Sequence, residues 1–192
     1  MLNKLDLHSS LPTVQEIATN FRLAGWINFG VQLGLLVVSG LIVLFAIADP
    51  NFNLKAQDAM SGLGLFCGVG GLLVLGLSLY WDWNYIRIGK DLQNPNPALH
   101  PKKADVISLL WRGLALNAAG MILTLFGVEV IVGTLVAKSL TQVQGMAIYN
   151  ASQLIEPLDM FVVQANINTI VAQFVGIISS AWLISRISYH PH

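Results

Sequence analysis

The sequence contains very little charge. Only 10% of its 192 residues are charged, and ten basic residues balance ten acidic ones to a formal net charge of zero. Soluble domains carry about 25% charged residues, so this chain has too few to cover a water-facing surface. An ordinary soluble domain is therefore excluded, and with no excess of basic residues we expect no nucleic acid partner.

The motifs of common enzymes and metal sites are also missing. Cys67 is the only cysteine, which excludes an intramolecular disulfide and a cysteine cluster, and we interpret it as a small buried hydrophobe. No phosphate loop, nucleophile elbow or HExxH helix is present. We expect no enzymatic activity and no cofactor, and the sequence leaves open whether a metal binds. The four histidines stand far apart in polar segments: His8, His100, His190 and His192.

What the sequence does contain is four long apolar stretches, at residues 23–48, 63–85, 113–137 and 158–187. Each is long enough for the ~20 residues that a helix needs to cross a ~30 Å hydrocarbon core. Strand-like alternation is absent, so helices rather than a closed barrel must satisfy the backbone in lipid. The sequence predicts an all-α polytopic integral membrane protein, with a bundle of four transmembrane helices over 23–187 and a short tail at 188–192.

Residues 1–22 form an amphipathic lead. Thr13 and Glu16 have the spacing of a capping box, and apolar residues between them and the first span share one helical face. We expect a short interfacial helix on the inner membrane surface, or a lead-in that only orders the first span. The acids Asp6 and Glu16 argue against a transit peptide, and the length of the first span argues against a cleaved signal.

Basic residues are distributed unequally between the two ends of the spans. Eight of the ten lie in the lead, in the connection between spans two and three, and at the C-terminus. The positive-inside rule then places both termini on the cytoplasmic or stromal side. Lys102 and Lys103 should attract anionic lipid by about 1 kcal/mol per charge. Aromatic rings that end the second span are expected at the same headgroup level: Tyr80, Trp81, Trp83 and Tyr85.

The last span carries an unusual number of polar residues. Asp159, Asn166, Gln173 and Ser180 recur every seven residues and form one stripe along a helix. A second set, Gln164, Asn168 and Ser179, falls on roughly the opposite side. Because polar groups are costly in lipid, we expect this helix to be enclosed on both sides.

The other spans show narrower polar and small-residue faces. In the first span Gly25, Asn28, Gln32 and Ser39 share a side, and the third has a groove that includes Asn117 and Thr124. Small residues let helix backbones approach closely, so the sequence predicts a set of packing glycines. These are Gly30, Gly34, Gly64, Gly68, Gly113, Gly120 and Gly127.

Two acids in the spans need separate treatment. Glu129 lies eight or nine residues from the outer end near Lys138, and an acid at such depth is a functional hypothesis by default. We expect it to form a polar pocket with Gln164, Asn166 and Asn168, although a protonated acid used for packing explains it equally well. Asp82 stands at the inner edge of the second span, and we interpret it as a surface acid near Arg87 or Arg112.

Several segments together resemble a plastid inner-envelope family that also has cyanobacterial members. The most specific is Leu158–Thr169, in which an Asp and a Gln five residues apart precede an AxxNT pattern. The others are Tyr85–Arg87 with Leu92 and Gln93, Ala104–Val106, Gly113 with Asn117, Gly120 and Met121, and Leu135–Lys138. The family is described both as a component of the protein-import translocon and as an iron permease.

The resemblance implies two alternative functions. The first is transport of a divalent metal ion such as iron. The second is a non-enzymatic scaffold or accessory subunit in protein import, membrane insertion or photosynthetic complex assembly. Either role implies membrane lipids and a homo-oligomer or other membrane proteins as partners, in a cyanobacterial plasma or thylakoid membrane, or in the plastid inner envelope for plant relatives. The intramembrane candidates for a transport or packing site are Glu129, Asp159, Gln164, Asn166, Asn168, Gln173, Asn117 and Gln32.

Overall fold

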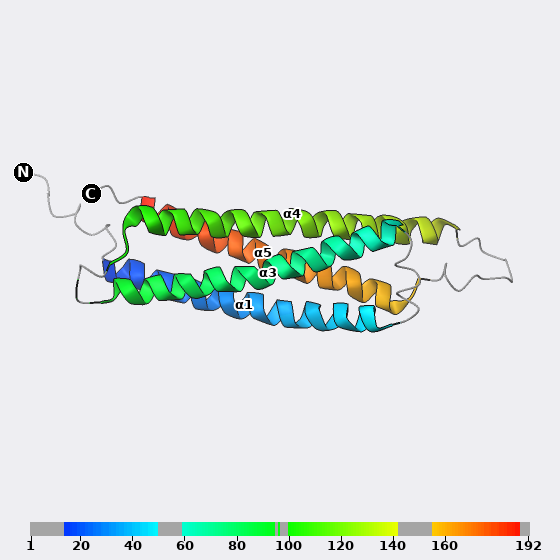
Figure 1. The fold of residues 1–192 in the computed structure, drawn as a ribbon, viewed down its shortest axis with the longest axis horizontal. Helices are drawn as coiled ribbons and strands as arrows, with labels where there is room; N and C mark the ends of the chain where they lie inside the picture. The colour runs from blue at the N-terminus through cyan, green and yellow to red at the C-terminus, as the bar shows by residue number, and fades with distance from the viewer. Residues whose placement is uncertain (1–13, 50–58, 95, 97–99, 142–154, 189–192) are drawn as a thin grey trace, which may run out of the picture.

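The computed structural model describes residues 14–49, 59–94, 96, 100–141 and 155–188, and these form an antiparallel bundle of four long helices (Figure 1). Each helix is long and apolar enough to cross a membrane, and the described residues contain no strand. The predicted fold class is confirmed. The helices are α1 Val14–Ala48, α3 Ala59–Leu92, α4 Lys103–Thr141 and α5 Pro157–Ser188.

The helices pack in a ring, in the order α1, α3, α4, α5 and back to α1. Neighbours in this ring run in opposite directions, so the described bundle begins and ends at the same end (Figure 1). A four-membered ring of helices encloses one face of each helix and leaves the opposite face to the surroundings. This geometry decides which polar residues are buried.

The N-terminal prediction is wrong in one respect. Residues 14–22 form the first turns of α1 rather than a separate interfacial helix. Phe21 is fully buried in a cluster with Tyr85, Leu110 and Leu183 from the other three helices. A continuous helix keeps its backbone hydrogen bonds and buries this phenyl ring completely, which a helix lying in the headgroups would not do. Residues 1–13 and 189–192 lie outside the described residues.

The depth of each residue follows from contacts between neighbouring helices. Gly25 lies beside Asp82, Gly113 beside Trp81, and Gly176 beside Asn117. Counting along the antiparallel helices from these contacts brings one tryptophan of each helix to a common level. These tryptophans are Trp26, Trp83, Trp111 and Trp182, which are 50%, 50%, 55% and 39% exposed.

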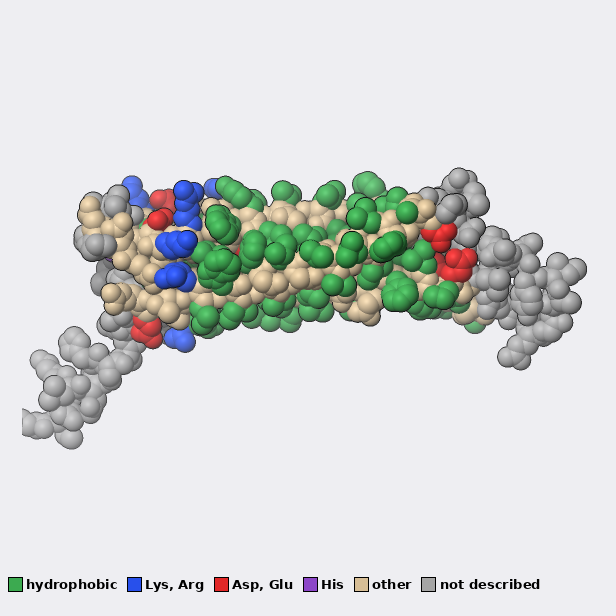
Figure 2. Space-filling model, turned by 90° about the horizontal axis from the view of Figure 1, so that it is seen from below, with side chains coloured by type: hydrophobic (Ala, Val, Ile, Leu, Met, Phe, Trp, Pro, Cys, Tyr) green, Lys and Arg blue, Asp and Glu red, His purple; other side chains and the backbone are tan. Residues whose placement is uncertain are grey.

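A belt of half-exposed indole rings is typical of a membrane headgroup boundary. Trp26 and Trp83 contact each other edge to face, with ring centroids 6.4 Å apart. Lysine and arginine side chains gather near the same end of the bundle, beside a broad hydrophobic region (Figure 2). We therefore place one membrane boundary at this tryptophan belt. The assignment of that side to cytoplasm or stroma stays a prediction.

Candidate functional site

A series of polar side chains is buried along the inside of the bundle, and we call it the polar column. All four helices contribute to it, and every member is at most 7% exposed. The members are Asn28, Gln32, Ser39, Ser78, Asp82, Asn117, Thr124, Asp159, Asn166, Thr169, Gln173 and Ser180. Such groups are costly in a membrane interior, so their partners decide what the column can do.

The heptad stripe of α5 is part of this column. Asp159, Asn166, Gln173 and Ser180 are all buried, which confirms that they share an enclosed face. The prediction that the second face is also enclosed is wrong, because Gln164 is exposed and Asn168 and Ser179 are partly exposed. The ring of helices covers only the first of the two faces.

Asp82 is the residue whose position sequence reasoning missed. It is 1% exposed, and one of its oxygens, Oδ1, accepts a hydrogen bond from Asn28 Nδ2 of α1. It is therefore not a surface acid beside Arg87 or Arg112. The spacing of Ser78, Asp82 and Tyr85 could have revealed this, because i, i+4 and i+7 lie on one helical face.

Hydrogen bonds continue from Asp82 towards the middle of the bundle. Gln32 Nε2 donates to Asn28 Oδ1 at 3.4 Å and to Asn117 Oδ1 at 3.5 Å, and Ser78 Oγ donates to Asn117 Oδ1 at 3.0 Å. These contacts connect α1, α3 and α4. They make Gln32 and Asn117, both predicted site residues, members of one network.

Tyr85 connects α3 to α5 at the same end of the column. Its hydroxyl lies 3.2 Å from Ser180 Oγ, and the side chain is only 1% exposed. The prediction that Tyr85 belongs to the interfacial aromatic belt is therefore wrong. Its polar tip finds a partner inside the bundle, as buried tyrosines require.

The part of the column that lies farther from the tryptophan belt depends on close packing of the helices. Gln173 Nε2 donates to the backbone carbonyl of Gly71 at 3.1 Å, and Thr124 Oγ1 donates to Gln173 Oε1 at 3.4 Å. The carbonyl of Gly71 is within reach because glycine has no side chain there, and a Cβ would clash with Thr124.

The predicted packing glycines divide into two groups. Gly64, Gly68, Gly113, Gly120 and Gly127 are buried, and a Cβ at any of them would collide with a neighbouring helix. Gly30 and Gly34 are exposed, and a Cβ there would meet nothing within 4 Å. These two glycines do not pack helices within the chain, because they lie on the outward face of α1.

Four buried oxygens of the column have no hydrogen-bond partner among the described residues. They are Asp82 Oδ2, Gln32 Oε1, Ser39 Oγ and Asn166 Oδ1. They lie at successive depths, since Gly68, which packs against Asn166, is 14 residues from Asp82 on α3. At 1.5 Å per residue this is about 21 Å along the bundle.

The pocket predicted around Glu129 is not formed. Glu129 and Gln164 are exposed on the outside of the bundle, where Gln164 Nε2 donates to Asn168 Oδ1 at 3.0 Å. Asn166 points to the opposite side, because two residues along a helix correspond to a rotation of about 200°. Its Nδ2 donates to the carbonyl of Val162 at 2.9 Å.

Asp159 has a local structural role at the start of α5. Its Oδ2 accepts a hydrogen bond from the backbone N–H of Glu156 at 2.9 Å, as in a capping box. Within the part of the chain that the structure describes, no three His, Cys, Asp or Glu side chains form a group that could hold a metal. Any cation in the column would therefore meet amides and hydroxyls with two carboxylates, Asp82 and Asp159, which lie near opposite ends of it.

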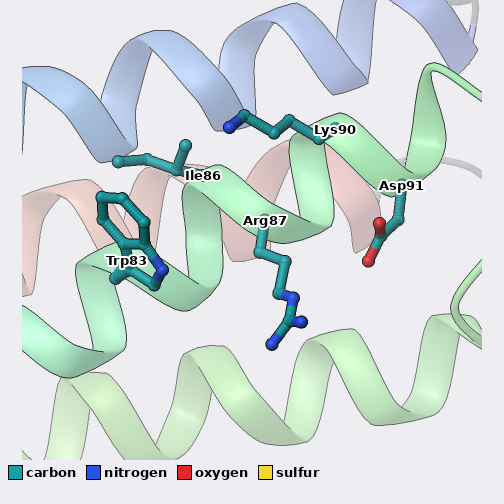
Figure 3. A pocket seen from close by; sticks show the side chains of 5 residues that line it. All are labelled: Trp83, Ile86, Arg87, Lys90 and Asp91. Atoms are coloured by element: carbon teal, nitrogen blue, oxygen red, sulfur yellow. The ribbon is translucent and has the colours of Figure 1, made fainter.

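A pocket of about 380 Å³ lies apart from the column, on the outward side of α3 at the tryptophan belt. It is lined by Trp83, Ile86, Arg87, Lys90 and Asp91. Figure 3 shows Arg87 and Lys90 extending from different sides of α3. Lys102 and Lys103 stand just before and at the start of α4, at the same end of the bundle. Anionic lipid binding by these two lysines stays a prediction.

The match to a known protein family covers nearly the same residues as the bundle. The family described as "Protein of unknown function (DUF3611)" matches residues 11–188. The chain belongs to this family. It is also 30% identical to Protein TIC 21, chloroplastic, from Arabidopsis thaliana, over an alignment that covers 97% of this chain and 63% of that protein. This chain thus spans somewhat less than two thirds of the relative, and no solved structure matches it.

These matches confirm the resemblance to a plastid membrane family. Together with the four spanning helices they identify an integral membrane protein.

Proposed function

We propose that this protein is a transport component of its membrane, and that the polar column conducts a divalent cation, with iron as the first candidate. The observation that carries the proposal is the set of four partnerless oxygens at successive depths in the column. Buried polar atoms nearly always have a hydrogen-bond partner, so four unpaired oxygens in one column require a functional explanation. Oxygen ligands are those that hard cations prefer.

The chemistry of these oxygens suits passage better than storage. Conduction needs several weak sites, because a cation must enter readily and also leave. Amide and hydroxyl oxygens with two widely separated carboxylates offer moderate attraction, whereas a cluster of carboxylates or imidazoles would retain the metal. Asp82, the one carboxylate of the column with a partnerless oxygen among the described residues, lies at the belt end of the column and would attract the cation there.

The family resemblance supports a role in membrane transport. The similarity to Protein TIC 21, chloroplastic, supports a plastid-type membrane. The plastid family that the sequence resembles is described as an iron permease as well as an import component. We propose no enzymatic activity.

The test is cation flux into vesicles that contain only this protein. Purified wild type should raise the entry of ferrous or manganous ion above that of empty vesicles. Asp82→Asn should lower this flux strongly, because an amide binds a cation more weakly than a carboxyl group does. Glu129→Gln is the matched control, since it replaces an acid by its amide outside the column. No flux in the wild type, or equal loss in both variants, would reject the proposal.

A second candidate function is a scaffold in protein import, insertion or photosynthetic complex assembly. It is favoured by the polar and small residues on the outward faces, namely Glu129, Gln164 and Asn168, with Gly30 and Gly34. Small and polar residues in lipid-facing positions are typical of contacts between membrane helices. If vesicles show no flux while substitutions on the outward faces release a membrane partner, the scaffold function is the correct one.

A further inference from the structure

Three polar side chains project from the outside of the bundle within its membrane-spanning part. Glu129 belongs to α4, and Gln164 and Asn168 belong to α5. We call these three the outer polar face. Glu129 and Gln164 are exposed and Asn168 is partly exposed, so none of them belongs to the polar column.

All three lie within the hydrocarbon region set by the tryptophan belt. Glu129 follows Trp111 by 18 residues, and Asn168 and Gln164 precede Trp182 by 14 and 18 residues. At 1.5 Å per residue they lie about 21 to 27 Å from the belt, inside a core ~30 Å thick. The contact between Asn117 and Gly176 puts Glu129 and Gln164 at the same depth on adjacent helices.

The other two helices provide a contrast. In α1 between Trp26 and Ala46, and in α3 between Gly62 and Trp81, the only amide or acidic side chains are Asn28 and Gln32, and both are fully buried. The outward faces of α1 and α3 expose only apolar and aromatic side chains and glycines through this region. At this depth of the described bundle, exposed amide and carboxyl groups thus occur on α4 and α5 and not on α1 or α3.

The hydrogen-bonding groups of the outer polar face are complementary. Gln164 Nε2 donates to Asn168 Oδ1, which leaves the Asn168 amide N–H groups and the Gln164 carbonyl oxygen without a partner among the described residues. Glu129 also makes no contact of this kind there. A carboxylate accepts what an amide N–H donates, yet in one chain the two groups project outward from separate helices.

We propose that two copies of this chain pair through their α4–α5 sides, with the Glu129 carboxyl of each copy accepting hydrogen bonds from the Gln164 and Asn168 amides of the other. A two-fold axis along the membrane normal brings α4 of one copy to α5 of the second, and it keeps equal depths together. The symmetric contact forms the same two hydrogen bonds to each Glu129, four in all. The pairing removes the polar groups from lipid, where they are costly.

Cross-linking tests which side of the bundle forms the contact. In a Cys67→Ala background, single cysteines replace Val132 on α4, Ile167 on α5 and Leu44 on α1. Leu44 is the matched control, because its depth lies between those of the other two. All three positions are exposed, at 38%, 43% and 64%. Each single-cysteine variant is reconstituted in vesicles at low protein density and treated with a short flexible bis-maleimide. Dimers at Val132→Cys and Ile167→Cys but not at Leu44→Cys support the proposal, and any other pattern overturns it.

A second measurement tests the role of the polar groups themselves. The double variant Gln164→Leu with Asn168→Leu should weaken dimerisation by about fifty-fold, the loss expected for four interhelical hydrogen bonds, two from each copy. Val171→Leu on the same face of α5 is the control and should leave it unchanged. The monomer–dimer equilibrium is followed by counting photobleaching steps in vesicles over a range of protein densities. Equal affinities for all variants would overturn the proposal.

Discussion

Asp82 and Glu129 are carboxylates in apolar helices, and the fold treats them in opposite ways. Asp82 stands at the end of its span by sequence, yet it is buried and receives a hydrogen bond from Asn28. Glu129 stands deep in its span, yet it is exposed on the outside of the bundle. The side of the helix, and not the distance from its end, decides whether an acid enters the interior.

The same division runs along α5. Gln173 is fully buried and bonded to Gly71 of α3, whereas Gln164, nine residues earlier, bonds only Asn168 on its own helix. Chemically identical amides therefore have different tasks. Those of the polar column connect helices within one chain, and those of the outer polar face are available to a second chain.

The strongest test of this comparison is Asp82→Ala. It removes a buried carboxyl group and leaves the buried Asn28 Nδ2 group without its partner, so we expect a loss of about 3 kcal/mol in the free energy of unfolding. Glu129→Ala should stay within about 0.5 kcal/mol, because surface substitutions rarely cost more. Both are measured by reversible unfolding of the monomer in detergent micelles. Equal losses would show that the two acids do not differ as described.

A second test compares glycines on the two sides of the helices. A Cβ at Gly127 would lie 2.9 Å from Cys67 Cβ and 3.0 Å from the Gly64 carbonyl oxygen, so Gly127→Ala must push α3 and α4 apart. We expect a cost of about 2 kcal/mol, as for other overpacked sites. Gly34→Ala meets nothing and should be neutral or stabilising by up to about 1 kcal/mol. Thermal midpoints in micelles check both variants.

Glutamine to leucine changes on α5 should give a smaller difference. Gln173→Leu leaves the Gly71 carbonyl and Thr124 without this partner, and we expect it to cost about 1 to 2 kcal/mol. Gln164→Leu should leave monomer stability nearly unchanged, since leucine suits a lipid-facing position. The same micelle unfolding assay applies. A larger loss from Gln164→Leu would contradict the outward placement of that side chain.

The smallest expected effect concerns Tyr85. Tyr85→Phe removes only the hydroxyl that faces Ser180, so we expect about 1 kcal/mol of destabilisation, typical of one hydrogen bond. Tyr80→Phe is the control, because Tyr80 is 63% exposed. If both changes are equally mild, the Tyr85 hydroxyl contributes nothing to holding α3 against α5.

Much of the fold could be predicted from the sequence, because hydrophobic length and periodicity act within one helix. The four spans, the shared face of Asn28 and Gln32, and the buried stripe through Asn166 and Gln173 all follow from such patterns. The prediction of a pocket at Glu129 is wrong for the same reason, because patterns within one helix do not fix contacts between helices. Equal depth on neighbouring helices does not imply contact, because depth leaves the rotation of each helix open.

Periodicity also could not choose between two polar faces of one helix. Either side of α5 was acceptable by pattern, and only the positions of α1, α3 and α4 select the face of Asn166 over that of Gln164. Gly30 and Gly34 illustrate the same limit on α1, because a small-residue motif does not state whether its partner is in the same chain.

The sequence by itself determined that this chain crosses a membrane four times, because long apolar segments with few charges have no other stable environment. Only the tertiary structure decided that Asp82 lies in the interior of the bundle and that Glu129 lies on its outside. The physical reason is that a ring of four helices encloses one face of each helix, and which face that is depends on contacts between residues far apart in the chain.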